Sequence, residues 1–414
     1  MPRVVLAGTL DTKGEEYAFV RDRLLAAGVE VTMVDTGILG EPAFTPDITR
    51  DEVAREAGVE LAELVAGGDR GASVIAMSRG LGRVIERLRA EGACDGALAL
   101  GGTGGTSLAA DAFRRLPLGV PKIVVSTAAS GNTAPYIGES DLVLIPSVVD
   151  VAGINRISAK ILAMASDALA GMVQGAPIPE TDRRPMVAAS MFGVTTPCIT
   201  TARALLEELG YEVLVFHMTG TGGRVLESLA AQGLLAGVLD MTTTELADEL
   251  VGGVFSAGEG RLRSAGVSGI PQVVSLGATD MVNFGPMDTV PPQFADRNLY
   301  VHNATTTLMR TTPEECAEMG RRLAERVRAG HGSRTVMIPL RGVSAIATEG
   351  GSFFDPDADT ALFDAVRTGL AGSDVTLLEL DTDINDPEFA RRAVTLLHEA
   401  ITAASTDNST QGSS

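Results

Sequence analysis

Short apolar runs rich in β-branched residues alternate with longer amphipathic segments along almost the whole chain. The runs "RVVLAG" (3–8), "EVTMVD" (30–35) and "KIVVST" (122–127) are examples, and segments with helical periodicity lie between such runs. This alternation is typical of βα units around a parallel sheet. A chain of 414 residues is too long for one ordinary core, so we predict an α/β protein of two domains.

A segment rich in Pro and polar residues, "QGAPIPETDRRP" (174–185), interrupts the alternation near the middle of the chain. Such a composition is typical of a connection between domains. We predict domains over 1–175 and 186–404 that are joined by a linker over 176–185. The polar stretch "STDNSTQGSS" (405–414) is predicted to form a disordered tail.

The two halves of the chain resemble each other in a fixed order. "GVEVTMVDTG" (28–37) matches "GYEVLVFHMTG" (210–220), and "GLGRVIERLRAEG" then matches "GTGGRVLESLAAQG". Further along, "PKIVVSTAAS" pairs with "PQVVSLGATD", and "SDLVLIPSVV" with "RNLYVHNATT". Any two α/β domains share such an alternation of strands and helices. The identical order of the matched segments nevertheless favours a duplicated domain, with an insertion near 38–79 in the first copy. We expect a ligand in the cleft between two such domains.

The charge of the chain makes several classes of partner unfavourable. A formal net charge of −20 at pH 7 argues against nucleic acid, because phosphate contacts need clustered Lys and Arg, and against anionic membranes. No apolar stretch reaches the length that a bilayer requires, and the N-terminus has no signal-peptide layout. Cys94, Cys198 and Cys316 are widely spaced and form no metal-type pairs. We therefore expect a cytoplasmic protein with no membrane or nucleic-acid partner.

The first strand-to-helix junction, "AGTLDTKGEEYAF" (7–19), carries polar residues that suit a bound anion. Lys13 is one of three lysines in the chain, and it lies where the free N–H groups of a helix N-terminus favour an anion. Asp11 is a candidate ligand for a metal ion or a hydroxyl group. A capping box would explain Thr12 and Glu15 without a ligand, but it would not explain a cation in the first helical turn. The binding residues predicted here are Gly8, Thr9, Thr12 and Lys13.

Four glycines and three hydroxyl residues follow a strand in "ALALGGTGGTSLAADAF" (97–113). Glycines remove the Cβ atoms that would keep a phosphate from the backbone, and successive N–H groups can then form a concave anion site. The stretch is neither a G-x-x-x-x-G-K-[ST] loop nor a dinucleotide fingerprint, since it reads G-x-G-x-x-S from Gly102. The residues expected to bind phosphate are Gly101, Gly102, Thr103, Gly104, Gly105 and Thr106.

The alternative for this stretch is a glycine-rich turn that packs a helix closely on the sheet. The matching junction of the second half, "GVLDMTTTELADEL", keeps the strand, the threonines and the helix but has no glycines. A turn needed only for the fold would not require glycines in one copy and dispense with them in the other. We therefore interpret the glycines as specific to a ligand of the first domain, and we predict a phosphate group.

Two other strand ends of the first half carry candidates. Asp35 ends a strand at a position where an acid can bind a ribose, although a turn or a helix cap is the alternative. The loop "STAASGNTAPYIGES" (126–140) is longer and more polar than a plain turn requires. Its residues Ser130, Gly131 and Asn132 are predicted to line a ligand pocket.

The second half carries weaker candidates for chemistry. His217 and His302 end strands, as acid–base groups would, but lone histidines are more often structural. Cys198 lies in the first turn of a helix, where the dipole lowers a thiol pKa, yet Thr196 and Pro197 explain that turn without catalysis. The acidic residues from Asp355 onward are interpreted as the start of a helix.

Long motifs of the chain resemble one known family. The motifs are "GTLDTKGEE", "GGTGGT", "STAASGNTAPYIGESD", "SMFGVTTPC", "FHMTGTGGRVLE", "LDMTTTEL", "SLGATDMVNFGP", "HNATTTLMRTTPEE" and "LRGVSAIATEGGSFFDPDAD". They resemble the Tm-one-like ATP-binding family, that of the tomato-mosaic-virus resistance protein and its uncharacterised bacterial and fungal relatives, over roughly residues 2 to 400. The resemblance implies two Rossmann-like subdomains, nucleotide binding and a homodimer.

Three functions compete at this stage. The first is an ATP-using enzyme that holds the phosphates on the glycine stretch and Lys13, with Mg²⁺ at Asp11 and an unknown small molecule in the cleft. Lys13 and Asp11 are its predicted catalytic residues. The second is a nucleotide-sensing module without enzymatic activity that binds a partner protein, since no base or nucleophile is compelling. A dinucleotide oxidoreductase is the third, and the failed fingerprint weakens it.

Overall fold

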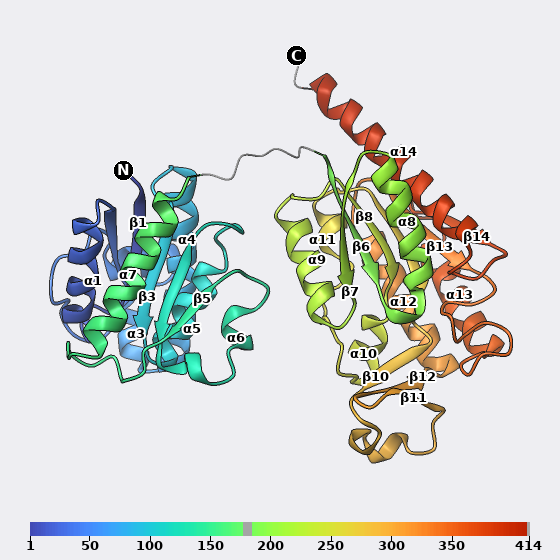
Figure 1. Cartoon of the computed structure of the whole chain (residues 1–414), viewed down its shortest axis with the longest axis horizontal. Coiled ribbons are helices and arrows are strands. Elements are labelled where there is room, and N and C mark those ends of the chain that lie inside the picture. The colour runs from blue at the N-terminus through green and yellow to red at the C-terminus, as the bar shows by residue number, and fades with distance from the viewer. Residues whose placement is uncertain (177–183, 412–414) are drawn as a thin grey trace. The chain divides into compact units, whose positions relative to one another are not determined.

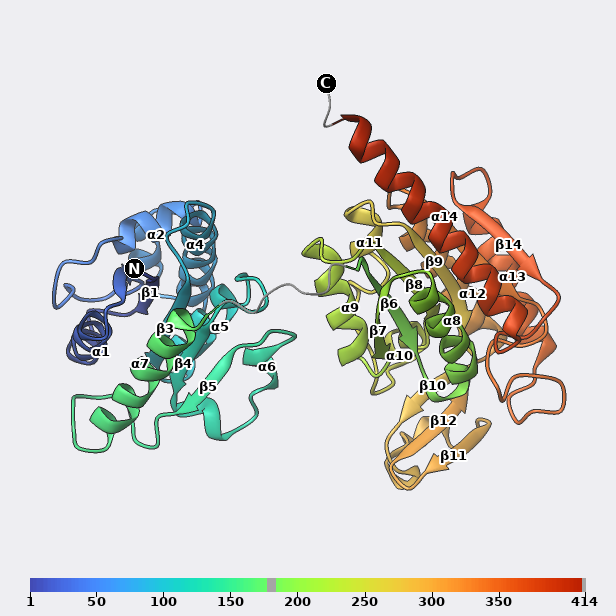
Figure 2. The same cartoon turned by 45° about the horizontal axis from the view of Figure 1, so that its top comes forward.

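The computed structural model describes residues 1–176 and 184–411. The chain divides into two compact units, Met1–Pro179 and Glu180–Ser414, which we call the first and second domain. Each domain has a mainly parallel sheet with helices on both of its faces (Figure 1, Figure 2). The predicted fold class, two Rossmann-like α/β domains, is therefore confirmed. Residues 177–183 of the predicted linker lie outside the described residues.

The first domain is a five-stranded parallel sheet with the order β2-β1-β3-β4-β5. Its strands are β1 (Arg3–Gly8), β2 (Glu30–Asp35), β3 (Gly96–Gly101), β4 (Lys122–Ser126) and β5 (Val143–Pro146). Its helices are α1 (Gly14–Ala26), α2 (Arg50–Glu56), α3 (Leu61–Gly67), α4 (Arg70–Ala90), α5 (Thr103–Phe113), α6 (Ala134–Ile137) and α7 (Ser158–Gln174).

The side chains of β1 show how the first sheet is buried on both faces. Val4 and Leu6 pack with residues of α1 and α7, whereas Val5 and Ala7 point to the other face and pack with residues of α4 and α5. A strand that is apolar at every position fits only a sheet covered on both sides, because successive side chains alternate between its faces. The continuous apolar runs of the sequence are thus explained by burial.

The second domain is a six-stranded parallel sheet with the order β14-β13-β9-β8-β6-β7, and a small antiparallel sheet, β10-β12-β11, extends from it. The strands are β6 (Met186–Met191), β7 (Glu212–His217), β8 (Gly237–Thr242), β9 (Gln272–Gly277), β10 (Met281–Phe284), β11 (Leu299–Asn303), β12 (Thr306–Arg310), β13 (Arg334–Pro339) and β14 (Thr376–Leu380). The helices are α8 (Thr196–Glu208), α9 (Thr221–Ala231), α10 (Glu245–Val251), α11 (Ser264–Val267), α12 (Pro313–Arg328), α13 (Pro356–Leu370) and α14 (Pro387–Gln411).

The strand orders of the two sheets agree with duplication. The order β7-β6-β8-β9-β13 of the second domain repeats β2-β1-β3-β4-β5 of the first. One predicted match is wrong, however: "RNLYVHNATT" forms β11, which pairs antiparallel with β12, and β13 takes the place that corresponds to β5. A tight turn joins β11 to β12, in which Asn303 Oδ1 accepts from the Thr305 N–H at 2.9 Å. So short a turn permits only antiparallel pairing.

The helix starts follow local capping chemistry where the sequence predicts it. The Asp355 side chain accepts from the Ala358 N–H at 3.1 Å and caps α13, which confirms that interpretation of the acidic stretch.

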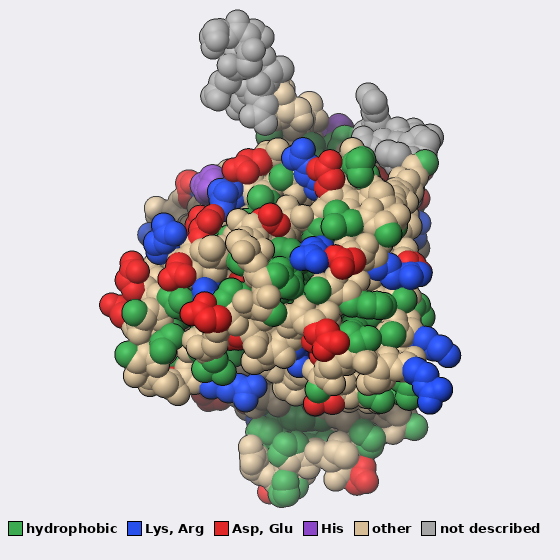
Figure 3. All heavy atoms as spheres, turned by 90° about the vertical axis from the view of Figure 1, so that its left-hand side faces the viewer, with side chains coloured by type: hydrophobic (Ala, Val, Ile, Leu, Met, Phe, Trp, Pro, Cys, Tyr) green, Lys and Arg blue, Asp and Glu red, His purple; other side chains and the backbone are tan. Residues whose placement is uncertain are grey.

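The predicted disordered tail begins inside α14, because this helix continues to Gln411, and residues 412–414 lie outside the described residues. On the molecular face drawn in Figure 3, Lys and Arg side chains are interspersed with Asp and Glu.

Candidate functional site

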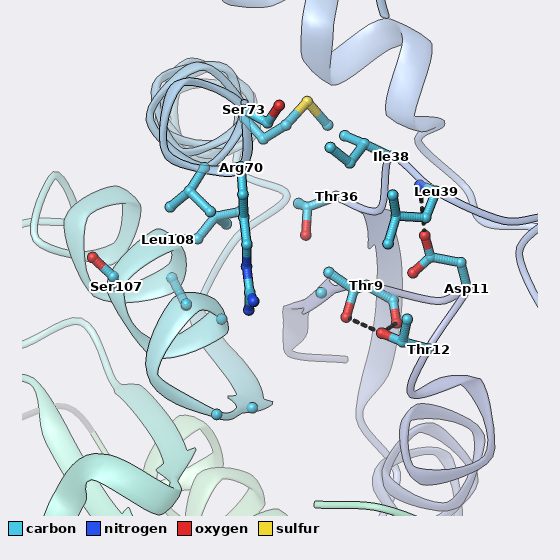
Figure 4. Close-up of a pocket in the computed structure, with 18 of the residues that line it drawn as sticks. Thr9, Asp11, Thr12, Thr36, Ile38, Leu39, Arg70, Ser73, Ser107 and Leu108 are labelled. Carbon is cyan, nitrogen blue, oxygen red and sulfur yellow. Dashed lines mark hydrogen bonds between the residues drawn. The ribbon is translucent and has the colours of Figure 1, made fainter. Parts of the chain in front are cut away.

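The strands β1 and β3 are neighbours in the first sheet, and the chain continues from them to opposite edges of the sheet, to β2 and to β4. The helices that follow β1 and β3 therefore lie on opposite faces of the sheet. Ligands of open α/β sheets bind at such a point, because the loops there diverge and leave a crevice. A cavity of about 1150 Å³ lies at this point. Its lining comes from the ends of β1, β2 and β3, from the starts of α4 and α5, and from α3 (Figure 4).

The glycine stretch forms one wall of the cavity. Gly101 ends β3, and Gly102 caps α5 without a side-chain hydrogen bond to the first turn. The first helical N–H groups of any α-helix have no partner within it, and here no side chain takes their place. A Cβ atom at Gly101 would lie 3.2 Å from the Gly105 Cα, so this glycine also lets α5 approach the strand closely. The wall therefore presents free backbone donors, as the sequence predicts, and close packing explains Gly101 in part.

A guanidinium that the sequence reasoning missed faces this wall. Arg70 is the first residue of α4, and Figure 4 shows its side chain extending into the space between the start of α5 and Thr9. A Cβ atom at Gly104 would lie 3.4 Å from Arg70 Nη2. Within residues 1–176 and 184–411, Arg70 makes no hydrogen bond or ion pair. Like the predicted Lys13, it is a cation at a helix N-terminus, so the same signal could have identified it.

Lys13 lines the cavity, but its ammonium group has a partner in the protein. Lys13 Nζ donates to the Val151 carbonyl, and the Glu16 carboxylate nearby accepts from the Gly153 N–H at 2.6 Å. Both side chains thus fasten the segment before α7 to the start of α1. Lys13 is itself the N-cap residue of α1, and it makes no side-chain cap hydrogen bond. The capping box of Thr12 and Glu15, weighed as the alternative to a ligand, therefore does not form.

Asp11 and Thr36 bring polar atoms to the opposite side of the cavity. Asp11 Oδ2 accepts from the N–H groups of Leu39 at 3.0 Å and Gly40 at 3.3 Å, while its Oδ1 has no partner among the described residues. The Thr36 hydroxyl is also buried, and no described residue bonds to it. Thr9 and Thr12 lie between these groups and the glycine stretch, and their hydroxyls are 2.8 Å apart.

Asp35 is not brought to the cavity. Its carboxylate is buried and accepts from the Leu10 N–H at 3.2 Å, the Gly37 N–H at 2.9 Å and Arg50 Nε at 2.7 Å. These donors satisfy both oxygens, so Asp35 holds the loops after β1 and β2 together. The structural alternative weighed for this residue, a turn-stabilising acid, fits its contacts, and a ribose contact does not.

Four other predicted residues also lie away from the cavity lining. The Thr106 hydroxyl is buried and lies 2.5 Å from Ser126 Oγ, so it joins α5 to the end of β4. Ser130, Gly131 and Asn132 are exposed at the end of the 3₁₀ turn that follows β4 and just after it, and Asn132 Oδ1 accepts from the Ala134 N–H at 3.2 Å. The structure thus brings together Gly8, Thr9, Asp11, Thr12, Lys13, Gly101, Gly102, Thr103, Gly104 and Gly105.

The Tyr17 side chain explains why position 8, on the cavity wall, is a glycine. A Cβ atom at Gly8 would lie 1.7 Å from the Tyr17 hydroxyl. That hydroxyl lies 2.8 Å from the Ala7 carbonyl and 2.9 Å from the Leu100 carbonyl, and it accepts from the Leu100 N–H at 3.0 Å. Tyr17 therefore bridges β1 and β3 beneath the cavity, and its burial raises its pKa.

The second domain fills the corresponding position with its own groups. The hydroxyls of Thr195 and Thr242 are 2.8 Å apart between the ends of β6 and β8. Glu245 Oε1 accepts from the N–H groups of Gly220 at 2.7 Å and Gly223 at 3.1 Å, at the glycine-rich start of α9. An internal carboxylate from α10 thus occupies backbone donors at the start of α9 in the second domain, whereas the donors at the start of α5 in the first domain face a cavity.

The weaker candidates of the second half do not form a site. His217 is exposed at the end of β7, with its ring edge-on to Phe192 at 5.3 Å, and His302 is exposed on β11. Burial raises the pKa of Cys198 to about 12, opposite to the effect of the helix dipole, so a structural role fits this thiol.

In the described part of the chain, no three His, Cys, Asp or Glu side chains cluster as a metal site would require. No helix of that part is long and apolar enough to cross a membrane.

Comparison with family models matches both halves of the chain. Residues 2–177 match the N-terminal domain of "Uncharacterised protein family (UPF0261)", and residues 184–401 match its C-terminal domain. A UPF0261 protein of Clostridium tetani is 48% identical over 388 residues, which cover 94% of this chain and 96% of that protein.

Two further similarities extend this comparison. The ToMV resistance protein Tm-1(GCR237) of Solanum lycopersicum is 40% identical over 419 residues, which cover 95% of this chain and 55% of that protein. Among solved structures, the UDP-N-acetylglucosamine 2-epimerase from Rickettsia bellii is 12% identical with a TM-score of 0.23, and the match covers 60% of this chain and 76% of that one. A score this low supports no argument.

Proposed function

This chain belongs to the uncharacterised protein family UPF0261, and we propose that its first domain binds ATP with the phosphates at the start of α5. One observation supports this most: Arg70 has no partner in the described residues and faces an uncapped, glycine-rich helix start. Backbone N–H groups at a helix N-terminus together with a guanidinium suit a phosphate in both charge and geometry.

The rest of the cavity suits a nucleotide better than a free phosphate. Its volume of about 1150 Å³ slightly exceeds the usual range of roughly 300–1,000 Å³ for small-molecule sites. Apolar side chains also line the cavity, among them Ile38, Leu39, Val74 and Ile75. A planar base would bury apolar surface against them while the phosphates meet Arg70 and the α5 N–H groups. The resemblance of the sequence motifs to an ATP-binding family points to the same ligand.

We infer that Arg70, rather than Lys13, is the principal phosphate cation. The Lys13 ammonium already donates to the Val151 carbonyl, whereas the Arg70 guanidinium has no acceptor in the described part of the chain. Mg²⁺ would fit at the phosphates themselves, since this ion is often held by one carboxylate together with phosphate oxygens. The carboxylate predicted for it, Asp11, lies on the side of the cavity opposite the start of α5 (Figure 4), so the phosphate oxygens would be the principal ligands of the ion.

Titration calorimetry of the full chain with ATP, in the presence and absence of Mg²⁺, tests this placement. Arg70→Gln should weaken ATP binding about 10- to 100-fold, because a hydrogen bond to a charged group contributes roughly 1.5–3 kcal/mol. Arg79→Gln is the matched control, as Arg79 is exposed on the same helix and does not line the cavity. Lys13→Gln should weaken binding less than Arg70→Gln does. Equal affinities for the Arg70 and Arg79 variants would refute the placement.

Whether bound ATP reacts separates two forms of the proposal. An ATP-using enzyme would release ADP when the second substrate is supplied, and the cleft predicted between the domains stays a prediction for that substrate. A nucleotide-sensing module would bind ATP without consuming it. The second form is favoured by the cavity lining, which has no His, Cys or Glu and whose acids are Asp11 and the helix-capping Asp69. Measuring ADP release by the purified chain decides between them.

The predicted homodimer is part of the same proposal. It rests on the resemblance of the sequence motifs, and light scattering after size-exclusion chromatography tests it. A mass near 42.8 kDa at micromolar concentration would contradict it, and twice that mass would support it. Measuring the mass with and without ATP shows whether the nucleotide affects assembly.

A further inference from the structure

Two buried polar atoms on the cavity wall have no hydrogen-bond partner in the described part of the chain. They are Asp11 Oδ1 and Thr36 Oγ1. The Asp11 side chain is 2% exposed and Thr36 is 3% exposed, so bulk water satisfies neither. Figure 4 shows both side chains at the cavity, on the side away from Ser107 and the start of α5. Buried polar groups are nearly always paired, so two unpaired ones on one cavity wall call for an explanation.

The free oxygen of Asp11 is held in a fixed position. Its other oxygen accepts from the Leu39 and Gly40 N–H groups, which fastens the carboxylate to the loop after β2. At Gly37, a Cβ atom would lie 2.7 Å from both Asp11 Cγ and Asp11 Oδ2, so this glycine lets the loop pack against the carboxylate. Oδ1 is thus presented to the cavity by a rigid contact and not by a mobile side chain.

The charges around Asp11 also favour a donor from the ligand. Arg50 Nε lies 2.7 Å from Asp35 Oδ2, and Arg50 Nη1 lies 3.7 Å from Asp11 Oδ2. One guanidinium therefore serves two buried carboxylates, and its direct hydrogen bond goes to Asp35. Asp11 keeps an incompletely compensated negative charge, which attracts a hydrogen-bond donor.

We propose that Asp11 and Thr36 bind the hydroxyl groups of the ligand's sugar, so that the cavity selects a phosphate ester of a sugar such as the ribose of ATP. This inference rests on the proposed function. A sugar hydroxyl donates to Asp11 Oδ1, and a neighbouring hydroxyl exchanges a hydrogen bond with Thr36 Oγ1. Asp11 in the loop after β1 and Thr36, which directly follows Asp35, thereby take the role that sequence reasoning gave to Asp35. A metal ion explains Asp11 less well, because it leaves the neutral Thr36 hydroxyl unused.

The test compares ATP with 2′-deoxy-ATP and 3′-deoxy-ATP by titration calorimetry of the full chain. The wild type should bind at least one deoxy analogue about 10-fold more weakly than ATP, because a site built to bond a hydroxyl rejects the analogue that lacks it. Asp11→Asn keeps an acceptor for Leu39 and Gly40 but places an amide donor where Oδ1 was. Thr36→Val removes the hydroxyl at nearly constant volume. Both variants should bind ATP about 10-fold more weakly and lose the discrimination against the deoxy analogue.

Asp47→Asn is the matched control, since Asp47 also accepts from a backbone N–H group, that of Met33, but does not line the cavity. It should bind all three nucleotides as the wild type does, and thermal unfolding shows whether each variant is folded. Equal affinity of the wild type for ATP and both deoxy analogues would overturn the inference and leave the proposed function intact. An Asp11→Asn effect that vanishes in EDTA would also overturn it, in favour of a metal ion. If no nucleotide binds at all, the proposed function itself fails.

Discussion

Replacing Arg261 by Met would remove the cation from the most deeply buried charge cluster of the second domain. Arg261 is fully buried, and its guanidinium meets three carboxylates. Nε lies 2.6 Å from Glu245 Oε2, the two Nη atoms lie 2.5 and 2.7 Å from the Asp240 oxygens, and Glu227 Oε1 lies 3.4 Å away. The variant leaves these acids without their cation, in a place that water does not reach.

The expected loss follows from the cost of an unpaired buried charge. Removing one partner of a buried ion pair costs about 3–5 kcal/mol, because the remaining charge cannot be solvated. In a domain of this size, each kcal/mol lowers the melting temperature by roughly 2–4 °C, so the second domain should melt on the order of 10 °C lower. The loss should shrink as the pH falls. Burial raises the pKa of Glu245 against the opposing effect of Arg261, so removing this cation raises that pKa further, and proton uptake then stabilises the folded state.

Calorimetric melting of the full chain measures this effect, and hydrogen exchange of peptides from residues 184–411 assigns it to the second domain. Arg263→Met is the control, because Arg263 is exposed and its Nε donates to the Glu259 carbonyl at 2.9 Å. That change should stay within about 0.5 kcal/mol of the wild type. If the Arg261 and Arg263 variants melt together, or if the Arg261 loss grows at low pH, the reasoning about the buried cluster is wrong.

Three further predictions concern single buried groups. Burial raises the pKa of Asp280 from 3.8 to about 6, so the folded state holds a proton that the unfolded state releases, and stability should fall as the pH rises from about 4 to 6. Asp280→Asn should flatten that part of a urea-unfolding profile, and an unchanged slope would contradict this. Burial raises the pKa of Cys198 to about 12, so it should react with a thiol reagent in urea but not in buffer at pH 8; mass spectrometry of the labelled peptide detects either outcome. Tyr17→Phe leaves backbone groups of Ala7 and Leu100 unpaired and should destabilise the first domain by about 1–3 kcal/mol, seen as faster exchange of the Leu100 amide; unchanged exchange would refute the bridge.

The parallel sheets were predictable because most of their strands are short apolar runs with a helix after them. The small antiparallel sheet was not, since β10 (Met281–Phe284) is short and follows β9 almost directly. The duplicated pattern matched β2 with β7 and β4 with β9 correctly, since these strands hold equivalent places in the two sheets. It failed at "RNLYVHNATT" because apolar residues alone do not distinguish a strand of the main sheet from one of a hairpin.

The strand ends that line the cavity were among those singled out in the sequence, but the contacts of each side chain were not predictable. The glycine stretch identified the start of α5 because backbone geometry there depends on local sequence. The partners of Lys13 and Asp35 depend on tertiary contacts, with Val151 and Arg50 respectively, that spacing does not encode. Arg70 was missed because it lies in the segment interpreted as an insertion, at a helix start that only the fold brings opposite the glycines.

The helix that precedes Arg70 has a consequence for how fast a ligand exchanges. None of the side chains of α3 (Leu61–Gly67) is fully buried, and this helix meets the core through the partly buried Leu61 and Leu64. Moving it aside therefore breaks few apolar contacts and leaves the sheet intact. The part of the rim formed by α3 can open while the floor, fixed by Tyr17, and Arg70 at the start of α4 stay in place. The dissociation rate of a ligand from this cavity would thus depend on how easily the short helix α3 moves away from the core. It would depend less on the contacts that the ligand makes with the floor and the glycine wall.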